Sequence, residues 1–182
     1  IVSMIVILNN IRSLHNVGSI FRTADAAGIE KLYLTGITPE PVDRFDKIRP
    51  QLAKVSLGAE SSVKWDGSTR SPRATLKLLE KLKKEGYKIF AVEQAENSVP
   101  YYKSKVPGLA GKSQKLKVAL VFGNEVNGLS PAILKKCDKI LEIPMRGAMV
   151  RQAHHPRHKK AGKESLNVSV AFGITVFGLL YK

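Results

Sequence analysis

The sequence predicts an α/β fold with a mainly parallel sheet and helices on both faces. Short apolar runs, each long enough for a buried strand, alternate with segments in which apolar residues recur at helical spacing. Strands that alternate with helices in this way favour a parallel sheet, because each strand needs a crossover before the next one. At 182 residues the chain is long enough for one good core, so we expect a single domain over residues 1–182.

The first third of the chain predicts two strands, one helix and a long loop. Residues 5–8 form an apolar run suited to a buried strand, and the following helix ends at Gly28. The apolar stripe of this helix consists of Val17, Ile20, Phe21, Ala24 and Ala27. Residues 31–35 are the next strand. A loop is expected after it, because helix and sheet interiors both reject the prolines of this stretch, which are Pro39, Pro41 and Pro50.

The rest of the chain continues the alternation. Ser71 and Pro72 open a helix, as N-cap and first residue, and Gly86 ends it. One face of this helix carries Leu76, Leu79 and Leu82. Strands are predicted at 89–92, 118–122 and 140–144, and a helix begins at Ser130-Pro131. The final helix carries on one face Leu166, Val170, Gly173, Ile174 and Phe177.

Composition narrows the partners and the compartment. Lys and Arg number 30 against 15 acidic residues, a net charge of +15, which favours a polyanionic partner over a merely soluble surface. The single cysteine, Cys137, excludes an internal disulfide and is expected to be a small, partly buried side chain. No apolar run reaches the roughly 18 residues of a membrane span, and the N-terminus lacks a basic leader. We therefore expect a cytoplasmic protein that does not enter membranes.

Several chemistries lack their sequence signatures. The chain has neither a G-x-G-x-x-G motif nor a G-x-S-x-G elbow, and Gly111-Lys112-Ser113 lacks the upstream glycine of a phosphate loop. The histidines of residues 154–158 flank Pro156, with no carboxylate or thiol beside them, so a solvated basic loop is favoured there over a metal site. We expect no bound metal.

Polar clusters follow the predicted strands, where open parallel sheets build ligand crevices. In the first cluster, Arg22 points away from the apolar stripe of its helix, either as a surface arginine paired with Asp25 or as part of a site. In the second, residues 123–128 form a tight loop whose small residues let the backbone approach a ligand and whose free amides can bind it. In the third, Ser165 and Asn167 are both good N-cap residues for the last helix, and either is also available to a site.

The three clusters, Asn16-Val-Gly-Ser-Ile-Phe-Arg22, Phe122-Gly-Asn-Glu-Val-Asn-Gly128 and Ser165-Leu-Asn-Val-Ser-Val170, resemble the signature motifs of the SpoU (TrmH-type) RNA ribose methyltransferases of the SPOUT superfamily. The resemblance runs over nearly the whole chain. It implies a C-terminal trefoil knot, a homodimer whose second subunit completes the site, S-adenosyl-L-methionine as cofactor, and tRNA or rRNA as substrate. Topology rules alone would not suggest a knot.

The resemblance also implies a role for individual residues. The catalytic centre would contain Arg22, Asn16, Glu125, Asn167 and Ser165. The cofactor would be held, largely through backbone contacts, at Gly123, Ile143, Leu166, Phe122, Met145 and Asn167, and RNA by Arg22 and Arg146. A guanidinium stays protonated in proteins, so we expect Arg22 to hold a phosphate and the developing alkoxide, oriented by Glu125 and Asn16, and the route of the proton stays open.

One segment departs from the family pattern. Family members run almost directly from Met145-Arg146-Gly147 to the Ser165-Leu-Asn segment, whereas here residues 148–162 intervene. This stretch is basic and has no apolar period, so we interpret it as a tolerated, flexible insertion. The first alternative function is therefore an RNA-binding protein of the same fold that has lost its cofactor. An unrelated doubly wound nucleotide enzyme is the second, supported only by the fold pattern.

Overall fold

The computed structural model describes residues 3–104, 116–145 and 165–181. Its strands are β1 (Ser3–Asn9), β2 (Lys31–Thr35), β3 (Trp65–Asp66), β4 (Lys88–Val92), β5 (Val99–Pro100), β6 (Lys117–Phe122) and β7 (Lys139–Glu142). Its helices are α1 (Leu14–Ala27), α2 (Pro50–Ser56), α3 (Ala59–Ser62), α4 (Pro72–Lys84), the 3-10 turn η1 (Tyr101–Lys103), α5 (Pro131–Leu134) and α7 (Val168–Leu180).

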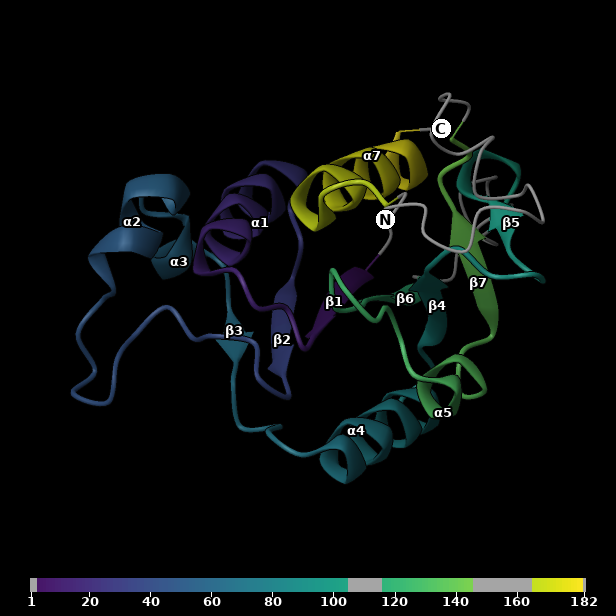
Figure 1. Ribbon diagram of the computed structural model, residues 1–182, viewed down its shortest axis with the longest axis horizontal. Helices are drawn as coiled ribbons and strands as arrows, with labels where there is room; N and C mark the ends of the chain where they lie inside the picture. Colours follow the sequence, from purple (N-terminus) through teal and green to yellow (C-terminus); the bar gives the residue numbers. More distant parts are fainter. Residues whose placement is uncertain (1–2, 105–115, 146–164, 182) are drawn as a thin grey trace, which may run out of the picture.

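All seven strands pair in parallel, in the order β3-β2-β1-β6-β4-β7-β5. Helices α1, α2 and α7 cover one face of the sheet, and α4 and α5 cover the other (Figure 1). This confirms the predicted fold class. The trefoil knot depends on the path of residues 146–164, which lie outside the described residues, so it stays an expectation.

Both faces of the sheet are buried, because successive residues of its central strands point to opposite faces and most of them are apolar. Along β1, Met4, Val6 and Leu8 face the core under α1 and α7, whereas Ile5 and Ile7 face the core above α4. All seven residues of β1 are buried. The sequence signal for this strand was therefore an unbroken apolar run instead of an alternating one.

The predicted helices are present with small shifts at their ends. Ser13 caps α1 by accepting a hydrogen bond from Asn16 N, and Gly28 ends the helix with φ 68°. Ser71 caps α4 as expected, and its hydroxyl accepts a hydrogen bond from Ala74 N at 3.1 Å.

Other details of the prediction were wrong or incomplete. Pro50 does not belong to a loop, because it is the first residue of α2, where its missing N–H costs nothing. The short elements α3, β3 and β5 were not predicted, since two to four residues carry no measurable period. Among the leucines of α4, Leu78 is buried and Leu76 is only partly so.

The sheet register brings the functional segments to one edge. Leu8 pairs with Phe122 and Val92 also pairs with Phe122, so β1, β4 and β6 end at the same level. The chain leaves neighbouring strands β1 and β6 toward opposite faces, to α1 and to α5 (Figure 1). Such a divergence opens a crevice at the carboxyl edge of a parallel sheet. None of the helices described is long and apolar enough to cross a membrane.

Candidate active site

Three residues from distant parts of the chain form a hydrogen-bonded trio in this crevice. Asn16 Nδ2 donates to Glu125 Oε1 at 3.1 Å, and Asn167 Nδ2 donates to Asn16 Oδ1 at 3.1 Å. The backbone N–H of Arg12 donates to the other carboxylate oxygen, Oε2, at 3.3 Å. One member comes from each of the three polar clusters, so the structure brings the clusters into contact.

Asn167 is the N-cap of α7 and also bonds to Asn16. Its Oδ1 accepts hydrogen bonds from Ser169 N at 2.9 Å and from the Ser169 hydroxyl at 2.7 Å, so Asn167 is the N-cap of α7. Its amide group is thereby aimed at Asn16. Ser165 does not cap the helix and instead lies exposed at the edge of a pocket.

The loop 123–128 closes on itself through Asn124. The Asn124 carboxamide oxygen accepts hydrogen bonds from the backbone N–H groups of Val126 (2.7 Å) and Asn127 (2.9 Å). The backbone carbonyl oxygen of Asn124 accepts a hydrogen bond from Gly128 N at 2.9 Å. The expectation of free amides is therefore wrong for residues 126–128, because the Asn124 side chain satisfies the amides of Val126 and Asn127 and its backbone carbonyl satisfies that of Gly128.

Gly123 is needed for a reason that differs from the predicted one. A Cβ at this position would lie 2.7 Å from both the Gly128 carbonyl carbon and Leu129 N, which real Cβ atoms do not tolerate. The glycine therefore permits the two ends of the loop to approach each other closely. Any effect on ligand binding is indirect, through the shape of the loop.

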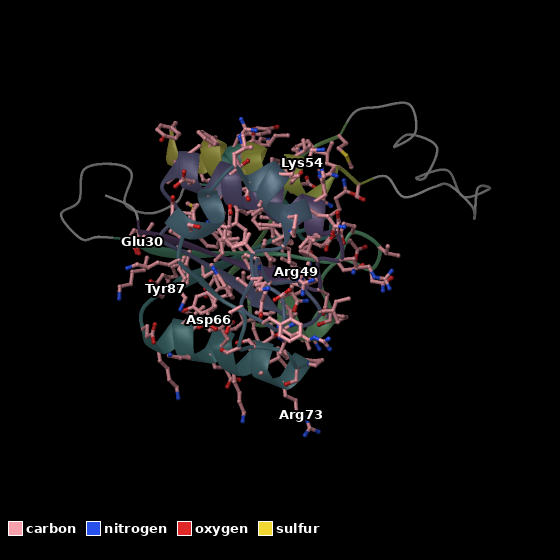
Figure 2. All side chains as sticks on the ribbon, turned by 90° about the vertical axis from the view of Figure 1, so that its left-hand side faces the viewer. Glu30, Arg49, Lys54, Asp66, Arg73 and Tyr87 are labelled. Carbon is pink, nitrogen blue, oxygen red and sulfur yellow. The ribbon has the colours of Figure 1, made fainter. Side chains whose placement is uncertain are left out.

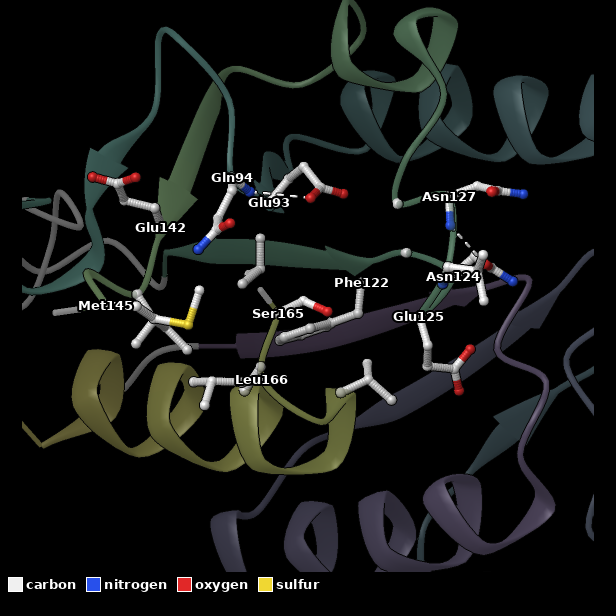
Figure 3. A pocket seen from close by; sticks show the side chains of 17 residues that line it. Glu93, Gln94, Phe122, Asn124, Glu125, Asn127, Glu142, Met145, Ser165 and Leu166 are labelled. Carbon is white, nitrogen blue, oxygen red and sulfur yellow. Dashed lines mark hydrogen bonds between the residues drawn. The ribbon is translucent and has the colours of Figure 1, made fainter. Parts of the chain in front are cut away.

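A pocket of about 320 Å³, which we call the Glu125 pocket, opens beside the trio (Figure 3). Its apolar wall is formed by Phe122, Ile143, Met145 and Leu166. Its acidic wall is formed by Glu93, Glu125 and Glu142. The carboxylates make the site complementary to a cationic group, and the apolar side chains suit a flat, uncharged ring.

The Glu125 pocket contains five residues predicted as cofactor-binding: Gly123, Ile143, Leu166, Phe122 and Met145. The sixth, Asn167, caps α7 next to it. Arg146 lies outside the described residues. The sequence did not point to Glu93, although it directly follows β4 at the same sheet edge. The Glu93 carboxylate accepts hydrogen bonds from Leu129 N (2.8 Å) and Gln94 N (3.1 Å), which ties the 123–128 loop to β4.

Comparison with known proteins decides the family. The model of the SpoU rRNA Methylase family matches residues 3–151, most of the chain. The chain belongs to the SpoU rRNA methylase family. Among curated relatives, the 23S rRNA (guanosine-2'-O-)-methyltransferase RlmB of Photorhabdus laumondii is 32% identical over 174 residues, or 95% of this chain and 57% of its own. The Salmonella typhi RlmB is 30% identical over 95% of this chain and 58% of its own. The chain thus spans a little over half the length of these relatives.

Solved SpoU-type structures share the fold. The TrmH/SpoU tRNA modifying enzyme of A. aeolicus superposes with a TM-score of 0.69 at 31% identity, covering 98% of this chain and 74% of its own. The AdoMet-bound rRNA methyltransferase of Sinorhizobium meliloti gives a TM-score of 0.73 at 23% identity, covering 97% of this chain and 55% of its own. At that lower identity the match shows the fold alone.

Arg22 lies apart from the trio within this SpoU chain. It is six residues after Asn16 on α1, which places it about 9 Å along the helix axis and about 120° around it. The stripe Val17, Ile20, Phe21 and Ala24 is buried on the opposite side, as predicted, so Arg22 is exposed. Its side chain makes neither an ion pair with Asp25 nor any other hydrogen bond or ion pair within the described parts of the chain.

Metal ligands are not clustered in the part of the chain that the structure describes. Within residues 3–104, 116–145 and 165–181, no three His, Cys, Asp or Glu side chains gather into a possible metal site. The histidines of residues 154–158 lie outside these ranges.

Proposed function

We propose that this chain transfers a methyl group from S-adenosyl-L-methionine to the 2'-hydroxyl of a ribose in rRNA or tRNA. The observation that carries this proposal is the shared position of Glu125, which lines the pocket and is also bonded within the trio. A cofactor in the pocket and a hydroxyl at the trio would therefore meet at one carboxylate. The RlmB relatives are 23S rRNA guanosine-2'-O-methyltransferases, which supports the same reaction class.

The Glu125 pocket fits the cofactor in shape and charge. The adenine ring would pack between Phe122, Ile143 and Leu166, which line the apolar side of the pocket. The sulfonium and ammonium groups would face the carboxylates of Glu93 and Glu142. The bound cofactor supplies an activated methyl group, so the protein needs no nucleophile of its own.

The remaining work falls to the polar residues around the pocket. The transfer needs the ribose oxygen held in line with the methyl group and its proton removed. Asn16, Glu125 and Asn167 form a rigid polar edge against which the ribose can be oriented. Arg22 would bind the adjacent phosphate and the alkoxide as a fixed positive charge, because a guanidinium does not lose its proton in proteins.

In a homodimer, Arg22 of one subunit would complete the active site of the other subunit, although it is remote from the trio of its own chain. Helix α7 is apolar on most of its surface, and Val170 and Phe177 on its outer face and Tyr181 at its C-cap are exposed by 48%, 39% and 71%. Phe177 and Tyr181 stack with ring centroids 5.6 Å apart. Helix α7 packs along α1, the helix that carries Arg22 (Figure 1). If a second copy of the chain packed on this face, Arg22 of one subunit would lie beside the substrate bound to the other subunit.

We also infer a single domain over residues 1–182. A cytoplasmic location is inferred as well, because rRNA and tRNA are found there.

Calorimetry with S-adenosyl-L-methionine tests this function and separates it from the alternative of a cofactor-free RNA-binding protein. The full chain should bind the cofactor, and Leu166→Asp should weaken binding because it puts a charge into the apolar wall. Leu57→Asp is the matched control, since Leu57, the C-cap residue of α2, is exposed by 65% and does not line the pocket. A full chain that binds RNA but not the cofactor would contradict the proposal.

The reaction itself is tested by mapping ribose methylation. RNA from cells that lack the gene should gain 2'-O-methyl groups when incubated with the protein and the cofactor. Primer extension at low nucleotide concentration would locate the methylated ribose. The proposal is wrong if methyl groups appear only on bases.

A further inference from the structure

A second pocket, which we call the Arg12 pocket, lies across the 123–128 loop from the Glu125 pocket. Its volume is about 450 Å³. Its walls come from the carboxyl ends of β1 and β2, the first turn of α4, and α5. Asn124, Asn127 and Gly128 line both pockets, so the loop is their shared wall. The Arg12 pocket has no role in the function proposed so far.

The two pockets carry opposite charge. Glu93, Glu125 and Glu142 line the Glu125 pocket. Among the described residues that line the Arg12 pocket, Arg12 is the only charged one. A cationic ligand is therefore favoured on one side of the loop and an anionic one on the other. Because RNA is the anionic partner of the proposed reaction, the Arg12 pocket is suited to RNA.

Three side chains of the Arg12 pocket retain hydrogen-bonding capacity. The Asn10 carboxamide oxygen accepts a hydrogen bond from Ile37 N at 3.1 Å, which leaves its NH2 group available. The side chains of Asn127 and Arg12 have no hydrogen bond or ion pair with any residue that the structure describes. Figure 3 shows the Asn127 side chain directed away from Met145 and Leu166. Carboxamides present a donor and an acceptor side by side, which matches the edges of nucleobases.

The remaining wall is apolar and partly open. Ile37 is 60% exposed at its rim, and Leu76 and Pro72 of α4 continue the surface inward. Apolar side chains of a pocket can pack against the faces of a flat base while polar groups bond its edges. The pocket therefore offers both elements of base recognition.

We propose that the Arg12 pocket binds the base of an RNA nucleotide next to the methylated ribose, with Arg12 on its phosphate. The backbone N–H of Arg12 donates to Glu125 Oε2 at 3.3 Å, and Glu125 is bonded to Asn16. A strand whose ribose lies at the trio thus reaches Arg12 with an adjoining nucleotide. This inference rests on the proposed function and deepens it, because it locates a determinant of the RNA sequence that the enzyme accepts.

Nuclear magnetic resonance titration of the full chain with each of the four ribonucleoside 5'-monophosphates tests the pocket without relying on methyl transfer. At least one nucleotide should give saturable shifts, in the millimolar range, of the backbone amides of Ile37, Leu76 and Ala132. Ile37→Glu should weaken this binding at least about tenfold, because it removes the apolar rim and adds a charge that repels phosphate. Ile48→Glu is the matched control, since Ile48 is 46% exposed and does not line the pocket; it should bind as the unaltered chain does.

The inference is overturned if none of the four nucleotides shifts these amides, or if Ile37→Glu and Ile48→Glu bind equally well. Cofactor titration gives the separate readout, because S-adenosyl-L-methionine should shift the amides of Gly123 and Leu166 in both variants. A chain that binds nucleotides in the Arg12 pocket but not the cofactor would refute the methyltransferase function and leave the nucleotide site standing.

Discussion

At the scale of single residues, the site is built from side chains that each serve two contacts. Asn167 caps α7 and holds Asn16, and Glu125 joins Asn16 to the backbone of Arg12 while lining the pocket. Arg22 is the exception, since it is exposed and makes no such contacts in the described chain. Its role must therefore be tested through catalysis.

Arg22→Ala should lower the rate of methyl transfer by about 10²- to 10³-fold, the usual cost of removing one donor to a developing oxyanion. Cofactor affinity should stay near that of the unaltered chain, because the partner of Arg22 is the RNA. Arg22→Lys should also be slow, since a lysine cannot form the bidentate contact that a guanidinium makes with a phosphate. Single-turnover kinetics at saturating RNA measures both variants. Near-normal rates for Arg22→Ala would remove the catalytic assignment.

Gly123→Ala should destabilise the fold by about 1–3 kcal/mol and weaken cofactor binding, because the new methyl group meets backbone atoms that cannot move independently. Gly173→Ala is the matched control, since its methyl group would meet only Thr23 Cγ2 at 3.7 Å. Within a helix that change should be neutral or stabilising. Thermal unfolding of the two variants would decide the matter, and equal melting temperatures would contradict the role of Gly123.

At the scale of elements, α7 shows most clearly that helical spacing does not identify the buried face. The face carrying Val170, Gly173, Ile174 and Phe177 is only partly covered, whereas Phe172 and Val176 on the other face are buried. Leu166 precedes the helix and lines the Glu125 pocket. An apolar helix of this kind needs a partner on each side.

Phe177→Asp should therefore shift the protein from dimer to monomer. The charge would be costly at a packed apolar interface but harmless on a free surface. Phe45→Asp is the control, because Phe45 is 64% exposed on the loop before α2. Light scattering after size exclusion measures the mass, and a dimer that survives Phe177→Asp would place the interface elsewhere.

Deletion of residues 148–162, which joins Gly147 to Lys163, should leave a folded protein that binds the cofactor at least as tightly. Ile143 and Leu166 flank the deleted segment and line the same pocket, and closure entropy changes slowly with loop length. Affinity for RNA should fall modestly, because basic residues are lost. A variant that stays folded by circular dichroism but loses the cofactor would show that the segment belongs to the pocket.

At the scale of the whole molecule, a strongly basic chain contains a pocket that is lined by acidic residues. The chain carries +15 overall, and Arg73 on α4 and Lys54 on α2 project from opposite sides of the sheet (Figure 2). The excess charge can thus draw RNA from several directions, while the Glu125 pocket keeps an acidic lining that favours a cationic ligand.

Affinity for RNA should fall by at least about tenfold between roughly 50 and 200 mM salt, because several cationic side chains displace counterions from phosphates. Binding of the cofactor should change far less over the same range. Fluorescence anisotropy with a labelled RNA gives the first slope and calorimetry the second. A flat dependence for RNA would argue against a broad electrostatic footprint.

The sequence by itself determined the fold class, the long elements and the membership of the three polar clusters in one site. Apolar runs and helical stripes are local signals, and the residues within each motif are neighbours in the chain. Its predictions failed where elements are too short to show a period, as in α3 and β5, and where an amide was satisfied within its own turn, as by Asn124.

Only the tertiary structure decided which groups meet. The Asn16–Glu125 and Asn167–Asn16 bonds join residues 109 and 151 positions apart, which the register of β1 with β6 and the packing of α7 against α1 bring to one edge of the sheet. The tertiary structure also placed Glu93 beneath the loop and opened the Arg12 pocket across the loop. Contacts of this kind depend on how strands align in space, which no local pattern in the chain encodes.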